Sequence, residues 1–384
     1  MNDDARALDL IQRRALVVGA AGLLVCVLGA IGSPRQFFQS YLVGYLFWAG
    51  IALGCTAIVM LHHLVGGGWG VAIRRLLESG TRTFPFLALL LIPLLFGLRH
   101  LYIWARPEVV AADELLQHKQ PYLNVPFFLL RTAFYFAVWL VLAYFLNRWS
   151  DEQDRTQSPA VQGRLQKLSG PGLVIYGLTV TFASVDWVMS LEPHWYSTFY
   201  GIIFMVGQAL ATLAFVITAL MVLSSRTALG GMLTAQNFHD LGNLMLAFVR
   251  LWAYVAFSQF LIVWSGNLPE EIPWYIARMG GGWGWIAGGL IVFHFALPFL
   301  LLLSRQNKRR LRTLATLAAA MLVLRLVDLF WIVAPAFHEK QFHVHWMDLA
   351  APVGIGGIWI AAFVWQLKRR PLLPAGAVAL SKAA

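Results

Sequence analysis

The chain has 384 residues, of which 59% are apolar and only 12% are charged, and its mean hydropathy is +0.67. A soluble domain has about a quarter of its residues charged, and a disordered chain has few apolar residues, so both classes are excluded. The net charge of +11 does not indicate nucleic-acid binding, because the basic residues flank apolar runs, a position typical of topology signals and contacts with lipid headgroups.

Ten apolar runs of membrane-spanning length follow one another along the chain, at 15–32, 40–64, 84–105, 125–147, 171–190, 197–223, 239–265, 283–303, 313–334 and 347–367. We therefore expect residues 1–384 to form one all-α polytopic membrane domain with ten transmembrane helices. The N-terminal segment carries acidic residues and no small-residue cleavage site follows the first run, which predicts an uncleaved anchor.

The basic residues also predict the orientation of the chain. With the N-terminus inside, twenty Lys and Arg residues lie on inner segments and five on outer loops. This bias predicts that both termini are cytoplasmic. The longest inner segment, from Arg148 to Gly170, is polar, and we expect it to be a mobile loop.

The fifth and ninth runs share a short pattern. Asp186 and Asp328 lie near the outer ends of their runs, and each is followed seven residues later by a proline, Pro193 or Pro335. This echo suggests two related four-helix bundles, at 40–190 and 197–334, with one flanking helix each, at 15–39 and at 347–384, the last including a cytoplasmic tail.

Ionisable side chains within apolar runs are costly in lipid, so each one requires a partner or a function. The residues at the inner edge and at middle depth form a candidate proton path, and they are His62, His63, His239, Asp240, Asn243, Arg250, Tyr254, His294, Arg325 and Asp328. Arg325 and Asp328 are three positions apart, so they share a helix face and can form an ion pair.

The seventh run carries the longest polar stripe. His239, Asn243, Arg250, Tyr254 and Ser258 share one face of a helix with 3.6 residues per turn, and we expect this face to lie in the protein core. The stripe is either a chain of proton carriers or a buried face whose polar groups set helix packing.

A second set of ionisable residues belongs to the outer half of the membrane: Arg99, His100, Arg131 and Asp186. Asp186 has no basic residue within four positions, so it needs an arginine from another run, either Arg99 or Arg131. A carboxylate beside His and Arg is what quinol oxidation requires of a proton acceptor, so this set is a candidate outer quinol or proton-exit site.

The sequence offers no ligand set for a metal or a redox cofactor. Cys26 and Cys55 each lie inside an apolar run, and no Cys-x-x-Cys-His motif for haem c occurs. Haem b requires facing histidines, whereas His294 is the single mid-membrane histidine. The histidines and Glu192 of the outer loops match no known metal-ligand spacing.

Two strings carry a resemblance to a known family. Residues Asp186 to Trp195 are DWVMSLEPHW, followed by Ser197 and Thr198, and residues Ser265 to Tyr275 are SGNLPEEIPWY. With the ten runs, they resemble the smaller membrane subunit of alternative complex III, a quinol:cytochrome c oxidoreductase, which is the ActF-type relative of the NrfD/PsrC family. The likeness covers nearly the whole chain.

The resemblance implies two four-helix bundles related by duplication, in a subunit of the bacterial cytoplasmic membrane that binds no redox cofactor. It implies as partners a larger NrfD-like sister subunit, an iron–sulfur subunit and multihaem cytochrome c subunits, besides lipids, so that haem c and iron–sulfur clusters belong to those partners. In the family the quinone or quinol site belongs to the sister subunit.

We therefore expect a non-redox subunit of a respiratory or photosynthetic electron-transport complex, which acts as a scaffold and a path for proton translocation. Catalysis is expected from the complex and not from the isolated chain. The alternatives are a subunit that binds quinol itself and a stand-alone secondary transporter, although the few mid-span prolines and the absence of doubly broken runs disfavour a transporter.

Overall fold

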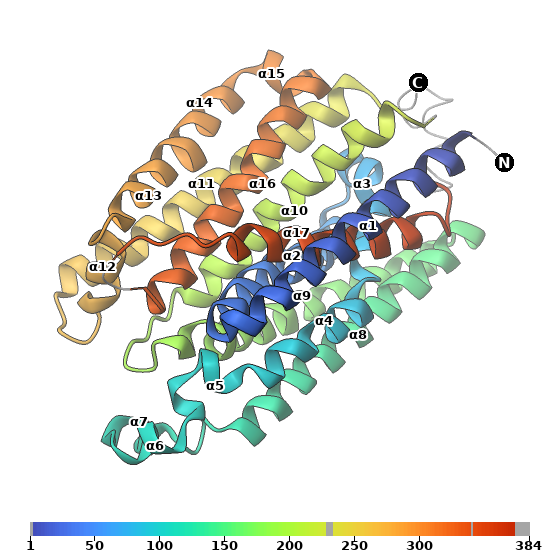
Figure 1. Cartoon of the computed structure of the whole chain (residues 1–384). Coiled ribbons are helices and arrows are strands. Elements are labelled where there is room, and N and C mark those ends of the chain that lie inside the picture. The colour runs from blue at the N-terminus through green and yellow to red at the C-terminus, as the bar shows by residue number, and fades with distance from the viewer. Residues whose placement is uncertain (1–2, 228–232, 339–340, 373–384) are drawn as a thin grey trace.

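The computed structural model describes residues 3–227, 233–338 and 341–372. This part of the chain is helical and contains no strand (Figure 1). It has nine helices long and apolar enough to cross a membrane, or up to ten if one bent pair of helices forms a single span. The expected all-α polytopic membrane fold is therefore confirmed.

The long apolar elements are α1 (Asp3–Gly32), α2 (Pro34–Val65), the bent pair α3 (Gly68–Thr81) and α4 (Phe84–Phe96), α8 (Val125–Thr156), α9 (Pro159–Trp187), α10 (Tyr200–Ser224), α11 (Ala235–Gly266), the series α13 (Trp283–Gly289), η4 (Leu290–Ala296) and α14 (Leu297–Leu303), α16 (Leu311–Val333) and α17 (Met347–Leu367). Short elements connect them: α5 (Leu98–Leu101), η1 (Ile103–Ala105), α6 (Pro107–Ala111), α7 (Glu114–Lys119), η2 (Met189–Leu191), α12 (Ile272–Met279), α15 (Arg305–Arg309) and η5 (Ala334–Ala336).

The start of the first long helix, α1, and the end of the last one, α17, lie on the same side of the molecule. Lys368 Nζ, just after α17, lies 2.5 Å from Asp9 Oδ1 in the first turns of α1. We call this end the termini side, and the opposite end, where Figure 1 shows α5, α6, α7 and α12, the α12 side. Because the described chain begins and ends on the same side, it crosses the membrane an even number of times.

The helices form two groups of four that meet in the centre. In the first group α2 packs on α9 and α4, and α8 packs on α9 and α4; in the second, α10 packs on α11 and α16, and both of these contact η4. The almost entirely buried α2 and α10 join the groups. Their backbones approach closely at Gly54, where the Thr212 hydroxyl donates to the Ile51 carbonyl at 2.9 Å.

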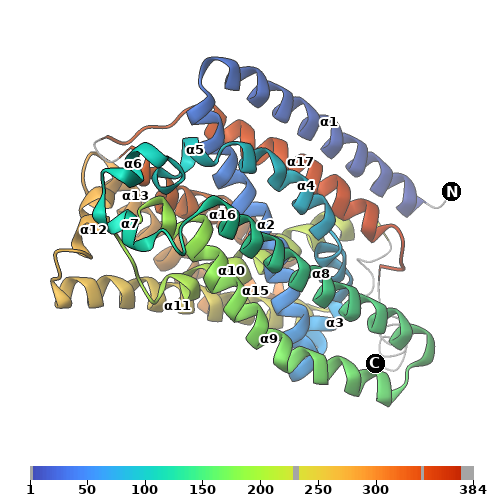
Figure 2. The same ribbon diagram turned by 90° about the horizontal axis from the view of Figure 1, so that it is seen from below.

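The two flanking helices, α1 and α17, pack against each other and along α2. Figure 2 shows them side by side at one edge of the molecule. Glycines permit the contact: a Cβ atom on Gly357 would lie 2.4 Å from the Cα of Gly19, and one on Gly354 would lie 3.0 Å from the carbonyl carbon of Gly22. Small residues of this kind allow the close backbone approach on which helix packing in lipid depends.

The expected third span at 84–105 is wrong in its bounds. Helix α4 has only 13 residues, and the apolar segment continues upstream into α3 across a bend of 43°. Residues 98–105 instead form α5 and η1. Helix α3 can pack in the core although it carries charged residues, because these residues form ion pairs with one another and with α8.

The expected mobile loop from Arg148 to Gly170 is also wrong. Helix α8 continues to Thr156, and α9 begins at Pro159 after a tight connection in which Gln157 adopts a left-handed conformation with φ of 47°. The Ser158 side chain caps α9 by accepting a hydrogen bond from the Ala160 amide. The helix persists because Asp154 of its last turns pairs with Arg75 of α3 and Asp151 pairs with Arg82, the residue just after α3.

Candidate functional site

Three groups of ionisable side chains in the described core are each built on a buried carboxylate. We name each by its carboxylate: the Asp328 group lies between α11 and α16, the Asp186 group between α8 and α9, and the Glu78 cluster between α3 and α8 on the termini side. Each carboxylate is at most 3% exposed and accepts bonds from several donors. This is how a membrane protein stabilises an ionised group away from water.

In the Asp328 group, Arg325 and Asp328 form the ion pair expected from their spacing. Asp328 Oδ2 also accepts a hydrogen bond of 3.0 Å from Trp252 Nε1 of α11. Gly207 of α10 makes room for the arginine, since a Cβ atom there would lie 2.2 Å from a guanidinium nitrogen. His294 is fully buried, with its ring centroid 4.2 Å from that of Trp252, and neither ring nitrogen has a described partner.

His294 lies in η4, a π-helical segment within an otherwise α-helical span. Such segments widen the helix locally and are frequent at functional sites. Arg325 also lines a cavity between α2, α9, α10 and α16, and the rest of the lining is apolar apart from Ser184 and Gln208. The core therefore combines an unpartnered imidazole with a cavity at one arginine.

In the Asp186 group, the arginine partner is Arg131. Its Nε and Nη2 atoms donate to the two carboxylate oxygens at 2.8 Å each, and the Tyr135 hydroxyl donates to Oδ2 at 2.6 Å. The guanidinium also lies 3.8 Å from the ring centroid of Tyr122. This bidentate geometry is the strongest arrangement available to a carboxylate and an arginine, so the group is fixed in place.

The other two members of the predicted outer set lie elsewhere. Arg99 and His100 are exposed, because α4 ends at Phe96 and α5 projects toward the α12 side. The Arg99 carbonyl accepts a bond from Arg106, and the His100 ring stacks on Phe38 with centroids 5.3 Å apart. The structure thus brings together Arg131 and Asp186 and separates them from Arg99 and His100.

His62 and His63 are buried at the end of α2, as expected for the inner edge of the core. Their ring centroids are 5.9 Å apart, and His62 Nδ1 and His63 Nε2 have no hydrogen-bond partner among the described residues. The His62 ring packs against Trp69, in a space that a side chain on Gly70 would fill. The charges of Arg74 and Glu78 act on both imidazoles in opposite directions.

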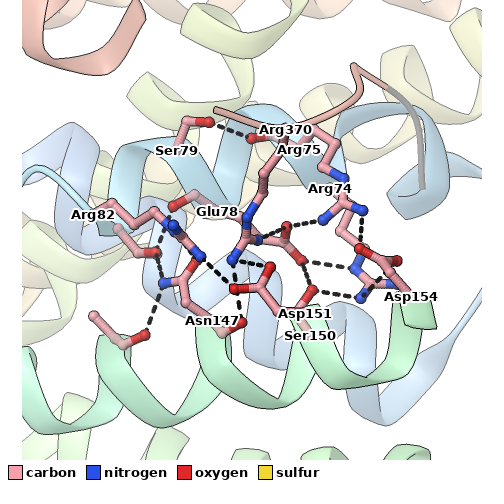
Figure 3. Close-up of polar contacts among 12 residues, drawn as sticks. Arg74, Arg75, Glu78, Ser79, Arg82, Asn147, Ser150, Asp151, Asp154 and Arg370 are labelled. Atoms are coloured by element: carbon pink, nitrogen blue, oxygen red, sulfur yellow. Dashed lines mark hydrogen bonds and ion pairs between the residues drawn. The ribbon is translucent and has the colours of Figure 1, made fainter. Parts of the chain in front are cut away.

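The Glu78 cluster was missed by the sequence analysis (Figure 3). The Glu78 carboxylate accepts from Arg74 Nε at 2.8 Å, from Arg75 Nη1 at 2.7 Å and from Arg370 Nη1 at 3.1 Å, and also from the Ser150 hydroxyl. These residues come from α3, α8 and the segment after α17, so one buried carboxylate ties together three distant parts of the chain.

The rest of the cluster extends along α8. Arg82 donates to Asn147 Oδ1 at 2.7 Å and to Asp151 Oδ2 at 3.0 Å, while Asp151 also pairs with Arg370, and Arg75 with Asp154. Asn147, Ser150, Asp151 and Asp154 are three or four positions apart and so share one face of α8, but the residues between them are also polar, apart from Trp149. The sequence therefore predicts a polar loop here, and only the structure shows which face meets α3.

The polar stripe of α11 shares one face, as predicted, but the expectation that this face is buried is wrong. Asn243, Arg250 and Tyr254 are exposed, and the last is 68% exposed. The buried face of α11 is the opposite one, with Leu241, Gly242, Met245, Val249, Trp252, Val255, Gln259 and Val263. Larger apolar contacts to α10 and η4 decide which face turns inward.

The base of the stripe forms polar contacts of its own. His239 Nδ1 lies 3.3 Å from Asn243 Nδ2 and 3.7 Å from Asp240 Oδ1, and Asp240 accepts from Gln236 at 2.7 Å. Lys308 of α15 donates to Asn243 Oδ1 at 2.7 Å. Burial lowers the pKa of the Lys308 amine below its ordinary value. Gln236 and Asn243 are exposed, His239 and Asp240 are half-buried, and Lys308 is buried.

The two strings that carry the family resemblance meet on the α12 side. Trp195 Nε1 donates to the Glu271 carbonyl at 3.1 Å, and its ring stacks on Trp274 with centroids 4.9 Å apart. Arg278 of α12 is fully buried and donates from Nη2 to Glu192 at 2.6 Å. The strings therefore form one continuous piece of structure.

Chemically, the carboxylates of the three groups are fixed by arginines, whereas His62, His63 and His294 each have a buried ring nitrogen with no hydrogen-bond partner in the described part of the chain. In the described residues, no three His, Cys, Asp or Glu side chains come together as metal ligands. No family model matches the chain, and no curated protein matches it either. The resemblance described above therefore stays a prediction.

Proposed function

We propose that the chain is a non-redox membrane subunit of a quinol:cytochrome c oxidoreductase of the alternative complex III type, in a bacterial cytoplasmic membrane. Two features support the proposal: the resemblance of the strings at Asp186–Trp195 and Ser265–Tyr275 to that family, and their contact through Trp195 and Trp274. The subunit would act as a scaffold for haem-bearing and iron–sulfur partners.

We further propose that the subunit carries part of a proton route. The observation behind this step is the set of buried imidazoles with free ring nitrogens: His62 and His63 near the Glu78 cluster, and His294 beside the Asp328 group. An imidazole ring can take up a proton on one nitrogen and release a proton from the other. Waters between these depths would complete the route.

The route proposed here leaves out the exposed face of α11. Asn243, Arg250 and Tyr254 are exposed and His239 and Asp240 are half-buried, so the proposed route does not include them. This gives the experiment an internal comparison, because the same chemical change can be made at a histidine inside the route and at one outside it.

The test uses the whole complex in sealed vesicles, with proton release measured per quinol oxidised. We expect His294→Leu and Asp328→Asn to lower the proton yield while the complex still assembles and transfers electrons. His239→Leu should leave the yield unchanged. Unchanged coupling in an assembled His294→Leu complex would remove the proton route from the proposal.

A secondary transporter is favoured by one observation, the 43° bend between α3 and α4, since transporters often have broken helices. The bend lies beside the Glu78 cluster, where Arg82 holds Asn147 in the last third of α8, and not at mid-depth. Purification in mild detergent separates the two functions. A transporter would be recovered alone, whereas the proposed subunit would be recovered with haem-bearing partners.

A quinol site in this chain would need more room than the cavity beside Arg325 offers, because its volume of about 30 Å³ accommodates water and not a quinone ring. Both oxygens of Asp186 already accept hydrogen bonds from Arg131, so this carboxylate is not free to accept a proton from quinol. Quinone density in the cavity would support quinol binding by this subunit, and density only in a sister subunit would exclude it.

A further inference from the structure

Helix α11 presents an outward row of exposed side chains, of which Asn243 alone forms a hydrogen bond to another helix of the described chain, at Lys308. The row, which we call the α11 seam, comprises Asn243, Ala247, Arg250, Tyr254, Phe257, Leu261 and Trp264, all of them exposed. Its positions are spaced alternately four and three residues apart, the spacing with which one helix packs along another in a left-handed crossing.

Arg250 stands in the middle of this seam. It is the sixteenth of the 32 residues of α11, about 22 Å along the axis from the first residue and about 24 Å from the last. No hydrogen bond, ion pair or ring contact joins its guanidinium to any residue that the structure describes. A lone arginine at the centre of a spanning helix costs about 2.5–3.5 kcal/mol on insertion scales, so it calls for a partner.

Other exposed helix faces have a different character. In α1, the stretch from Ala15 to Gly32 has no charged residue, and its most exposed side chains are aliphatic, such as Leu24 at 60%. The outward face of η4 and α14 is likewise apolar, because the one ionisable residue of that span, His294, is buried. Those faces suit lipid tails, whereas the α11 seam suits protein.

The charge of Arg250 also indicates what the partner is. Two copies of this chain, related by an axis along the membrane normal, would bring two Arg250 side chains together at the same depth. Such like-charge contacts cost several kcal/mol. The fitting occupant is a helix of a different protein that carries an acidic residue at the depth of Arg250.

We infer that the α11 seam is a docking surface for a transmembrane helix of another protein, and that Arg250 forms an interchain ion pair with a carboxylate of that helix. Ala247, one turn before Arg250, lets the partner backbone approach, and the hydroxyl of Tyr254, one turn after it, provides a second polar contact. Phe257, Leu261 and Trp264 provide the apolar remainder of the surface.

This inference does not depend on the proposed function, since it rests on exposure and charge alone. The first experiment places a photo-reactive amino acid at Phe257 or at Leu261 in the native membrane. We expect an adduct with one defined polypeptide from both positions. Leu24 on α1 is the control, and we expect lipid adducts there. Adducts with lipid alone at the seam, or with a second copy of this chain, would overturn the inference.

The second experiment tests the ion pair in the complex recovered by mild detergent. Arg250→Glu should reduce the recovered partner on the order of 10-fold or more, and Arg250→Lys should retain most of it. Exchanging the cross-linked partner's carboxylate for arginine should restore the complex with Arg250→Glu. Full recovery of the partner with Arg250→Glu would contradict the ion pair. As a control for folding, the purified Arg250→Glu chain should remain monodisperse.

These outcomes separate the two proposals. A seam partner without haem and without quinol oxidation activity would overturn the proposed function and leave the docking surface standing. Lipid adducts at the seam of an active quinol-oxidising complex would overturn the docking surface and leave the function standing.

Discussion

Trp195 and Trp274 stack with ring centroids 4.9 Å apart and planes 16° apart, although one follows η2 and the other lies in α12. The Trp195 indole also donates to the Glu271 carbonyl at the start of α12. Trp195 is only 5% exposed, so its ring is packed inside the protein. Through these two contacts it holds α12 against the end of the first helix group. The stack thus couples the two helix groups on the α12 side.

We predict that Trp195→Ala destabilises the protein by about 3–5 kcal/mol, because it removes a large buried ring and leaves a cavity. The measurement is the midpoint of thermal unfolding of the detergent-purified protein. Tyr196→Ala is the matched control, since its neighbouring side chain is 53% exposed, and it should change stability by at most about 0.5 kcal/mol. Equal effects of both substitutions would contradict the role assigned to the stack.

Much of the fold could be predicted from the sequence, because lipid imposes strong constraints on length and composition. The spanning runs were marked from hydropathy alone, and nine helices plus one bent pair correspond to them. The pair Arg325 and Asp328 followed from their spacing on one helix, and the choice of Arg131 or Arg99 for Asp186 followed from depth. Such pairings depend on local periodicity and on charge, which a sequence displays.

The remaining features could not be predicted, because they depend on which helices pack together. The stripe of α11 shares a face, as its periodicity requires, but periodicity does not say whether a polar face meets the core or a partner protein, and Arg250 turned out exposed. Likewise, Arg75 and Glu78 look like loop residues until Asp154 and Arg370 are brought beside them by tertiary structure. Ion pairing can therefore extend a membrane helix beyond the point where its hydropathic run ends, as it does in α8.

The Glu78 cluster provides a sharp test of buried ion pairing. Glu78→Gln keeps the shape of the side chain but removes the charge that Arg74, Arg75 and Arg370 share. We predict a loss of about 3–5 kcal/mol in the free energy of unfolding, the usual consequence of leaving buried cations without their partner. Resistance to denaturant in mixed micelles is the measurement.

Glu152 supplies the matched control for this prediction. It forms an ion pair of 2.8 Å with Arg164, but both side chains are more than a third exposed. Exposed pairs of this kind contribute about 0–1 kcal/mol, so Glu152→Gln should be close to wild type. If Glu78→Gln proved as mild as Glu152→Gln, the cluster would not be holding α3 in the core.

The contact between α1 and α17 can be tested at one glycine. Gly357→Val would place a Cβ atom 2.4 Å from the backbone of Gly19, so the helices would have to move apart. We predict a loss of about 1–3 kcal/mol, as for overpacked interiors. Gly288→Val on α13 is the control, because no atom lies within 4 Å of a Cβ there. Unfolding midpoints that do not differ between these two variants would rule out the close packing.

His338, in the loop after η5, should make stability depend on pH. Burial lowers the pKa of its imidazole below the ordinary value of about 6.5, and the positive charges of His343 and Arg35 act in the same direction, partly offset by Asp348. Its backbone carbonyl accepts a bond of 3.0 Å from Trp283 Nε1, so the residue is held in a folded segment.

The sign of the effect follows from the lowered pKa. Above about pH 6.5 the imidazole is neutral in both the folded and the unfolded protein, so it leaves stability unaffected. As the pH falls below that value, the unfolded chain takes up a proton first, and stability falls until the folded pKa is reached. We predict that unfolding midpoints measured at pH 7.5, 6.5 and 5.5 decline less steeply for His338→Asn than for wild type. The exposed His118→Asn variant should keep the wild-type slope. A His338→Asn slope equal to wild type would contradict the prediction, because it would mean that the pKa of His338 is the same in the folded and the unfolded protein.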